Sequence, residues 1–217
     1  MIFAHHPVQM ECGDPKGEMG KGFLPVNPKL LEKLKAKGIS VYTCHAPLDA
    51  GSKSGLGTPE AIVNRLEGKI VGQYDPYAHG FAARIVELSN VYSVEELADE
   101  LKNMADLPYV DIQGLTKNEI KKVVVLPGGG GSYEDIKGAE DNGADCIITG
   151  EVTAKIEGER GDKERELLNE YYPKAKLTAI GLSHAGSEFI VMYDIVEWVK
   201  KKIGIEADVL SEEKWWR

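Results

Sequence analysis

The sequence predicts an α/β protein with two lobes, in which mostly parallel or mixed sheets are flanked by helices. Strand and helix signals alternate along the chain, as they do when helices connect the strands of a sheet. Several predicted strands, such as residues 122–126, are nearly continuous apolar runs, which is typical of strands covered on both faces. At 217 residues the chain is long enough for one large domain or two small lobes with a real core.

Strands are predicted where short runs of apolar, β-branched or aromatic residues lie between turn residues. The runs that meet this description are residues 2–4, 39–43, 122–126, 144–149 and 177–182. The first of them is so short that it reads as the end of a strand. We expect it to leave an unpaired sheet edge, and such edges are normally covered or paired.

Helices are predicted from their start and stop signals. Asn27 followed by Pro28 suits a helix start, and Ser93 with Glu96 forms a capping box. Gly38 and Gly143 follow two of the helical segments and end them. The predicted helices span approximately residues 28–37, 58–67, 93–104, 133–142, 163–171 and 187–202.

Two segments are predicted to lie outside regular structure. The glycine-rich residues 128–131 follow a predicted strand and precede a helix, so we interpret them as a functional or tight-turn loop. Residues 68–80 mix turn residues and predict a boundary between a first lobe, residues 1–70, and a second lobe, residues 71–217. We expect the lobes to be intertwined, with a metal site between them.

Composition excludes several classes of function. The net charge of -9 argues against non-specific nucleic-acid binding, which needs a basic face. No apolar run approaches the roughly 20 residues of a membrane span, and the first residues lack the features of a signal peptide. The three cysteines, Cys12, Cys44 and Cys146, are widely spaced and form no CxxC pair. We therefore expect a cytoplasmic protein with reduced thiols, of which Cys44 and Cys146 are core residues.

Four of the five histidines follow predicted strands directly. They are His5, His6, His45 and His184. Ligands of parallel α/β sheets bind at the carboxyl ends of the strands, so the imidazoles gather where sites form. A single histidine in such a place is more often structural than functional.

A carboxylate lies four residues after each of the last two of these histidines. Asp49 follows His45, and Glu188 follows His184. Either spacing alone is a weak signal, but the adjacent pair and the two spacings together predict a metal site. Nitrogen and oxygen donors suit zinc, iron or manganese, and no cysteine is placed to favour a thiolate site.

The adjacent histidines favour two ions over one. Neighbouring residues at a strand end project in different directions, so His5 and His6 cannot easily chelate one ion together. Glu188 lies near a helix start and could bridge two ions with its two oxygens. Two divalent ions carry four positive charges, of which Asp49 and Glu188 offset two. The surplus favours a bound hydroxide and a small anionic substrate.

Five segments of the chain resemble the NGG-interacting-factor-three-like family, also labelled GTP cyclohydrolase 1 type 2 homologs. They are FAHHPV at 3–8, YTCHAPLDA at 42–50, VVVLPGGGGS at 123–132, ADCIITGE at 144–151 and GLSHAGSE at 181–188. The resemblance implies a dinuclear metal centre and a toroidal homohexamer whose metal sites face an internal cavity. It also implies the metal ligands, which would be His5, His6, Asp49, His184 and the shared Glu188. His45 and Glu151 would be further ligands, or groups that orient ligands and relay protons.

Two features depart from the family pattern. Members usually have several dozen residues before the HHP motif, whereas four residues precede it here. Either the true start lies upstream, or this is a shortened variant whose missing surface another subunit covers. After TGE many members have further histidines, but this chain has VTAK at 152–155. Substrate specificity therefore does not carry over. The terminal Trp215 and Trp216 favour an oligomer interface or a tail resting on its own subunit.

Three functions are compatible with these observations. The first is a metal-dependent hydrolase of a phosphorylated or nucleotide-like small molecule, similar to GTP cyclohydrolase type 2. The second is a metal-binding scaffold or regulatory protein without catalysis, which closed coordination would distinguish from an open catalytic site. The third is a separate nucleotide site at residues 128–131. No GKS or GKT follows this loop, and Tyr133 breaks the GxGxxG pattern.

Overall fold

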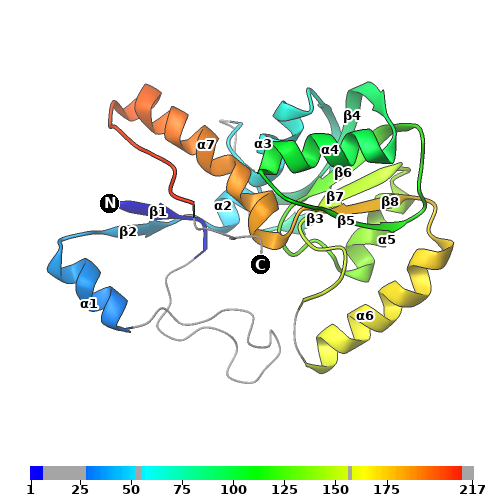
Figure 1. Cartoon of the computed structure of the whole chain (residues 1–217), viewed down its shortest axis with the longest axis horizontal. Coiled ribbons are helices and arrows are strands. Elements are labelled where there is room, and N and C mark those ends of the chain that lie inside the picture. The colour runs from blue at the N-terminus through cyan, green and yellow to red at the C-terminus, as the bar shows by residue number, and fades with distance from the viewer. Residues whose placement is uncertain (7–27, 52–54, 156–157, 212–217) are drawn as a thin grey trace.

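The computed structural model describes residues 1–6, 28–51, 55–155 and 158–211. These residues form a mixed α/β fold with one two-stranded and one six-stranded sheet (Figure 1). Four residues that the sequence singled out, Cys12, Asn27, Trp215 and Trp216, lie outside the described ranges.

The six-stranded sheet is mixed. Its strands, in spatial order, are β3 (Lys69–Tyr77), β4 (Gly80–Tyr92), β6 (Ile120–Leu126), β7 (Cys146–Thr149), β8 (Thr178–Gly181) and β5 (Asp111–Gly114). The three central strands β6, β7 and β8 are parallel, while β3, β4 and β5 join the sheet through antiparallel pairs. The predicted apolar runs therefore form the parallel centre, and more polar strands form the flanks.

Helices cover both faces of this sheet. One core cluster joins the sheet to α3 (Thr58–Arg65), α4 (Val94–Ala105) and α7 (His184–Ile203). A second cluster joins the opposite face to α5 (Tyr133–Asp141) and α6 (Glu159–Tyr171), which continues into a short 3₁₀ turn, Tyr172–Lys174. Both faces of β7 and β8 are thus buried, as the continuous apolar runs predicted. Among the described helices, none is long and apolar enough to cross a membrane.

The two-stranded sheet is small. Its strands are β1 (Ile2–Ala4) and β2 (Val41–Thr43), which run parallel with Ile2 opposite Val41. Helix α1 (Pro28–Ala36) precedes β2 and contains no buried residue, and the one-turn helix α2 (Ala46–Asp49) follows β2. Within the described ranges β1 pairs only with β2. The predicted open edge is therefore paired on one side.

Two strands were missed, one within the segment interpreted as a domain boundary and one that begins at its end. Residues 69–92 form the hairpin of β3 and β4. Gly72 and Pro76 weaken the strand pattern of β3, but this strand lies at the sheet edge, where proline is tolerated. A division after residue 70 would fall inside β3. The two-lobed division itself stays a prediction.

Candidate metal centre

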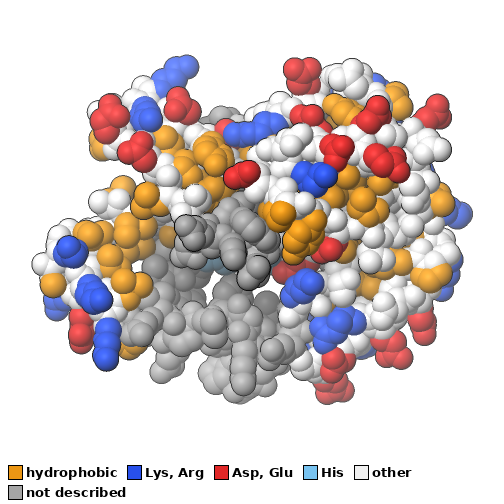
Figure 2. All heavy atoms as spheres, in the orientation of Figure 1, with side chains coloured by type: hydrophobic (Ala, Val, Ile, Leu, Met, Phe, Trp, Pro, Cys, Tyr) orange, Lys and Arg blue, Asp and Glu red, His pale blue; other side chains and the backbone are white. Residues whose placement is uncertain are grey.

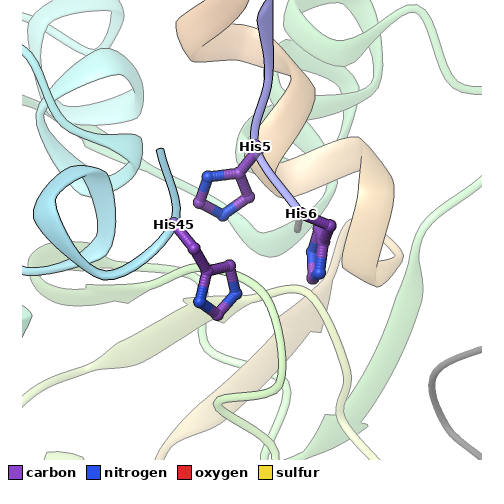
Figure 3. Close-up of side chains that lie close together, drawn as sticks. All are labelled: His5, His6 and His45. Carbon is purple, nitrogen blue, oxygen red and sulfur yellow. The ribbon is translucent and has the colours of Figure 1, made fainter. Parts of the chain in front are cut away.

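Two pairs of parallel strands present their carboxyl ends to the candidate site. His5 and His6 follow β1, and His45 comes two residues after β2. Glu151 follows β7, and His184 follows β8 at the start of α7. The expectation that the strand-end histidines lie together is confirmed, because the rings of His5 and His6 both lie 4.8 Å from that of His45 between centroids (Figure 3). The ring centroid of His6 in turn lies 5.4 Å from that of His184.

A backbone carbonyl group holds the ring of His5 in place. Its ring nitrogen Nδ1 lies 3.0 Å from the carbonyl oxygen of Cys44, to which it can donate. In the neutral ring, a bond of this kind selects the tautomer in which Nε2 is unprotonated and faces the site. Nε2 lies 3.1 Å from Asp49 Oδ1, is buried, and has no hydrogen-bond partner. A buried imidazole nitrogen without a hydrogen-bond partner fits the role of a metal ligand.

Glu188 uses both of its oxygens in the site. Oε2 lies 2.8 Å from His6 Nε2 and 3.6 Å from His5 Nε2, and Oε1 lies 3.2 Å from His184 Nε2. The residue is only 7% exposed. The loop after β6 approaches so closely that a Cβ at Gly128 would stand 2.2 Å from Oε1. The predicted glycine-rich loop therefore packs against the central carboxylate.

Helix α7 places His184 and Glu188 one turn apart on the same face. The helix begins at His184 and not near residue 187 as predicted, because the Ser183 hydroxyl caps it by accepting from the Gly186 amide. Glu151 Oε1 lies 2.8 Å from His184 Nδ1, so this carboxylate orients the ring from the side away from Glu188. Its other oxygen accepts from the Lys155 amide. This geometry matches a group that orients a ligand.

Helix α2 brings Asp49 back toward His45. His45 Nε2 lies 3.7 Å from Asp49 Oδ2, and the Thr58 hydroxyl donates to Asp49 Oδ1 over 3.4 Å. Asp49 thus lies between His5 and His45. The fifth histidine, His79, lies exposed in the turn of the β3–β4 hairpin and belongs to none of the donor groups found in the described residues.

The ionisation of the cluster is strongly coupled to its carboxylates. Burial opposes protonation of His5, but Asp49 and Glu188 outweigh it and raise the pKa of His5 to about 10. His184 behaves in the same way, since Glu151 and Glu188 overcome burial and raise its pKa to about 10. Burial opposes ionisation of Glu188, yet the surrounding histidines hold its pKa well below the ordinary range. Protons therefore balance the carboxylates in the metal-free site, and a cation would replace them.

Three groups of side chains bring ligand atoms close enough to hold a metal ion. They are His5 with His6 and His45, His6 with His184 and Glu188, and His5 with Asp49 and Glu188, each with ligand atoms within 4.8 Å of one another. Imidazole nitrogens and carboxylate oxygens suit zinc, iron or manganese. Together with the partnerless Nε2 of His5, the donor set fits a divalent metal.

His184 lines two cavities. The smaller, about 220 Å³, is lined by the metal-ligand candidates His6, His45, Asp49, His184 and Glu188. Its other walls come from β3, β4, the end of β6 with the loop after it, and α5. Three of these other residues, Asp75, Tyr77 and Asp135, were not predicted from the sequence, because they belong to no spacing motif. The larger cavity, about 430 Å³, is lined by Tyr109, Glu151, Lys155 and His184 among others.

The fold and the site together define an α/β protein with a histidine–carboxylate cluster able to bind metal. The family profile Duf34/NIF3 (NGG1p interacting factor 3) matches residues 1–214. The chain therefore belongs to the Duf34/NIF3 family, as the five sequence segments indicated.

Relatives of the chain carry two kinds of name. A protein of Clostridium acetobutylicum named GTP cyclohydrolase 1 type 2 homolog is 25% identical over 220 residues, which cover 98% of this chain and 74% of the relative. Protein NIF3 homolog of Schizosaccharomyces pombe is 28% identical over 166 residues, covering 70% of this chain and 54% of the relative.

Solved structures with the same fold support the architecture. A Bacillus cereus protein related to NIF3 has a TM-score of 0.66 at 14% identity, covering 99% of this chain and 82% of that one. Reduced HcgD from Methanocaldococcus jannaschii has a TM-score of 0.64 at 20% identity, covering 94% and 71%. At these identities the likeness concerns the fold alone.

Proposed function

We propose that this protein binds two divalent metal ions and is a metal-dependent hydrolase of a phosphorylated or nucleotide-like small molecule. The observation that carries the proposal is the sharing of Glu188 between two donor groups. One group is completed by His5 and Asp49, the other by His6 and His184. Glu188 Oε2 lies near His5 of the first group and His6 of the second, and its Oε1 lies near His184, so this carboxylate contacts both groups and is suited to bridging two ions.

The residues of the chain then have distinct roles. His5, His6, Asp49 and His184 would hold the ions together with Glu188. The ions, which we expect to be zinc, iron or manganese, would supply Lewis-acid activation of water and of the bond to be cleaved. His45 stands beside Asp49 with its pKa lowered by burial. It is therefore available as a neutral base to accept a proton at Nε2.

The surroundings of the cluster support a phosphorylated substrate. Gly129 and Gly130 line the smaller cavity without side chains, so a substrate can approach their backbone closely. Lys155 supplies a positive charge to the wall of the larger cavity, which is also lined by Tyr109, a residue that is 55% exposed. A small anionic substrate could place its reacting group at the cluster and its remainder in the larger cavity. The names of the relatives suggest GTP, with ring opening as the reaction, as one substrate to test.

The cavities also favour catalysis over a purely structural role. Structural metal sites are closed by protein ligands, whereas catalytic sites keep an open position. Here four of the five candidate ligands, all except His5, line the wall of a cavity. A metal-binding scaffold without catalysis would need no such space.

We also propose that the subunits assemble into a toroidal homohexamer in the cytoplasm. Apolar side chains gather over β1, β2 and α1 on the left of the molecule (Figure 2). Ile2, Leu30 and Tyr42 are 37%, 49% and 55% exposed. Contact with a neighbouring subunit would remove this apolar surface from water. Light scattering at micromolar concentration tests the assembly, and a well-behaved monomer would contradict it.

The catalytic proposal is tested by loading purified protein with zinc, iron(II) or manganese(II) in separate samples. Each sample is then screened with phosphomonoesters, nucleotides including GTP, and cyclic amides. We expect turnover in at least one loaded sample, and none in the metal-free protein or in loaded Glu188→Gln protein. Stable binding of two ions without turnover of any substrate class would favour the scaffold function.

A further inference from the structure

Asp75 shares the smaller cavity with the candidate metal ligands. It comes from β3, the edge strand of the six-stranded sheet, and not from any of the strand ends that supply the ligands. It belongs to none of the three donor groups. The cavity therefore contains a carboxyl group that the metal-binding role leaves unused.

The side chain of Asp75 has no hydrogen bond or ion pair within the part of the chain that the structure describes. Asp135, the other extra carboxylate of the cavity, differs in this respect. Its carboxylate accepts from the amide and hydroxyl of Ser132 and forms the capping box of α5. Asp135 thus stabilises a helix end, while Asp75 is free to contact a molecule in the cavity.

The backbone at Asp75 is held in an uncommon conformation. Its φ is 60°, in the left-handed region, although it lies within a strand. Asp106 has a similar φ of 50°, but there it is the C-cap of α4, where this conformation closes the helix. Such strain costs on the order of 1–3 kcal/mol and clusters at functional sites. In addition, burial alone raises the pKa of Asp75, which favours its protonated form.

We propose that Asp75 is the general acid of this site and protonates the leaving group of a phosphate ester. This inference rests on the hydrolase function proposed above. As water adds to phosphorus, the bond between phosphorus and the leaving oxygen breaks. The leaving oxygen takes the proton of the Asp75 carboxyl group and departs as an alcohol. The attacking water gives up a proton to His45, and the Asp75 carboxylate recovers that proton through solvent, so the step needs no other reactant.

The test compares leaving groups in the metal-loaded native protein and in Asp75→Asn. Ethyl phosphate needs protonation of its leaving oxygen, whereas p-nitrophenyl phosphate releases a stable anion without it. General acid catalysis contributes about 10²–10⁴-fold. We therefore expect Asp75→Asn to lose at least about 10²-fold in kcat on ethyl phosphate and less than about 10-fold on p-nitrophenyl phosphate. Metal content measured beside activity should equal that of the native protein.

Asp106→Asn is the matched control, because it makes the same chemical change at a similar φ but outside the cavity. Asparagine tolerates this conformation, so both variants should fold. Equal losses on the two esters would overturn the role of Asp75 and leave the hydrolase function intact. Loss of a metal ion in Asp75→Asn would make it a ligand and also overturn the role. Native protein that turns over neither ester would overturn phosphoester hydrolysis and this inference with it.

Discussion

The two halves of the candidate metal centre are built differently. Glu151, His184 and Glu188 rest on the six-stranded sheet, whose strands β7 and β8 are fully buried and followed by the long helix α7. His5, His6, His45 and Asp49 rest on two strands of three residues and on a single helical turn. Contacts across the site join the halves, chiefly those of Glu188 with His5 and His6. We call the half on the six-stranded sheet the rigid half, because its strands are fully buried. Metal binding would hold the half on the two-stranded sheet against it.

The largest expected effect comes from removing the charge that joins the halves. Glu188→Gln should weaken binding of both ions, because a neutral amide cannot bridge two cations. Asp49→Asn should weaken mainly the ion held by His5. We expect losses of affinity beyond the about 10–100-fold typical of changes to groups behind a ligand. Equilibrium dialysis against buffered zinc measures both variants. Equally small losses would mean that Glu188 does not join the halves.

Truncation of a leucine side chain should lower the free energy of unfolding more in the half on the six-stranded sheet than in the half on the two-stranded sheet. Leu97 of α4 is fully buried in the cluster over the six-stranded sheet, whereas Leu30 of α1 is 49% exposed. Leu97→Ala should cost about 2–5 kcal/mol of unfolding free energy. Leu30→Ala should cost no more than about 0.5 kcal/mol in an isolated subunit. Urea denaturation measures both. A comparable cost for Leu30→Ala would show that α1 is buried in an assembly.

Glu151→Gln tests the orientation of His184 within the rigid half. The amide can still contact Nδ1, but it no longer offers a charged acceptor that fixes the tautomer. We expect about 10–100-fold weaker binding of the ion held by His184. The ion held by His5 and Asp49 should bind as before. Competition with a zinc indicator resolves the two affinities. Loss of both ions would make Glu151 more than an orienting group.

The smallest effect concerns pH in the metal-free protein. The pKa values of His5 and His184 are raised from 6.5 to about 10, so the folded state binds more protons than the unfolded state between these values. Their contribution to stability is fully present below about pH 6.5 and is lost as the pH rises toward 10. We expect the melting temperature of metal-free protein to fall over this range more than that of loaded protein. Identical profiles would contradict a metal that replaces these protons.

The sequence predicted the strand-end part of the site because that part follows from a general rule. Parallel strands bring their carboxyl ends to one edge, so the histidines after β1, β2 and β8 could be expected to meet. The same pattern placed Asp49 and Glu188 one helical turn from a histidine. The tautomer of His5 could not be predicted, because it depends on a contact with the Cys44 carbonyl that only the fold creates.

The rest of the fold depended on pairings that local sequence does not encode. Strand β5 is exposed throughout its four residues and owes its conformation to pairing with β8. The β3–β4 hairpin was missed because Gly72 and Pro76 interrupt its pattern, although β4 pairs with β6 in the sheet centre. Asp75 was missed with it. A carboxylate that enters the site from an edge strand carries no spacing signal.

Metal stoichiometry tests directly whether a dinuclear centre joins the two halves. Purified protein is loaded separately with excess zinc and manganese, freed of unbound ions by gel filtration into buffer containing a low concentration of the same ion, and analysed by plasma mass spectrometry. We expect two ions per chain with at least one of the metals, and a value reduced toward zero for Glu188→Gln. Saturation of native protein at one ion per chain, or at none, would contradict the account.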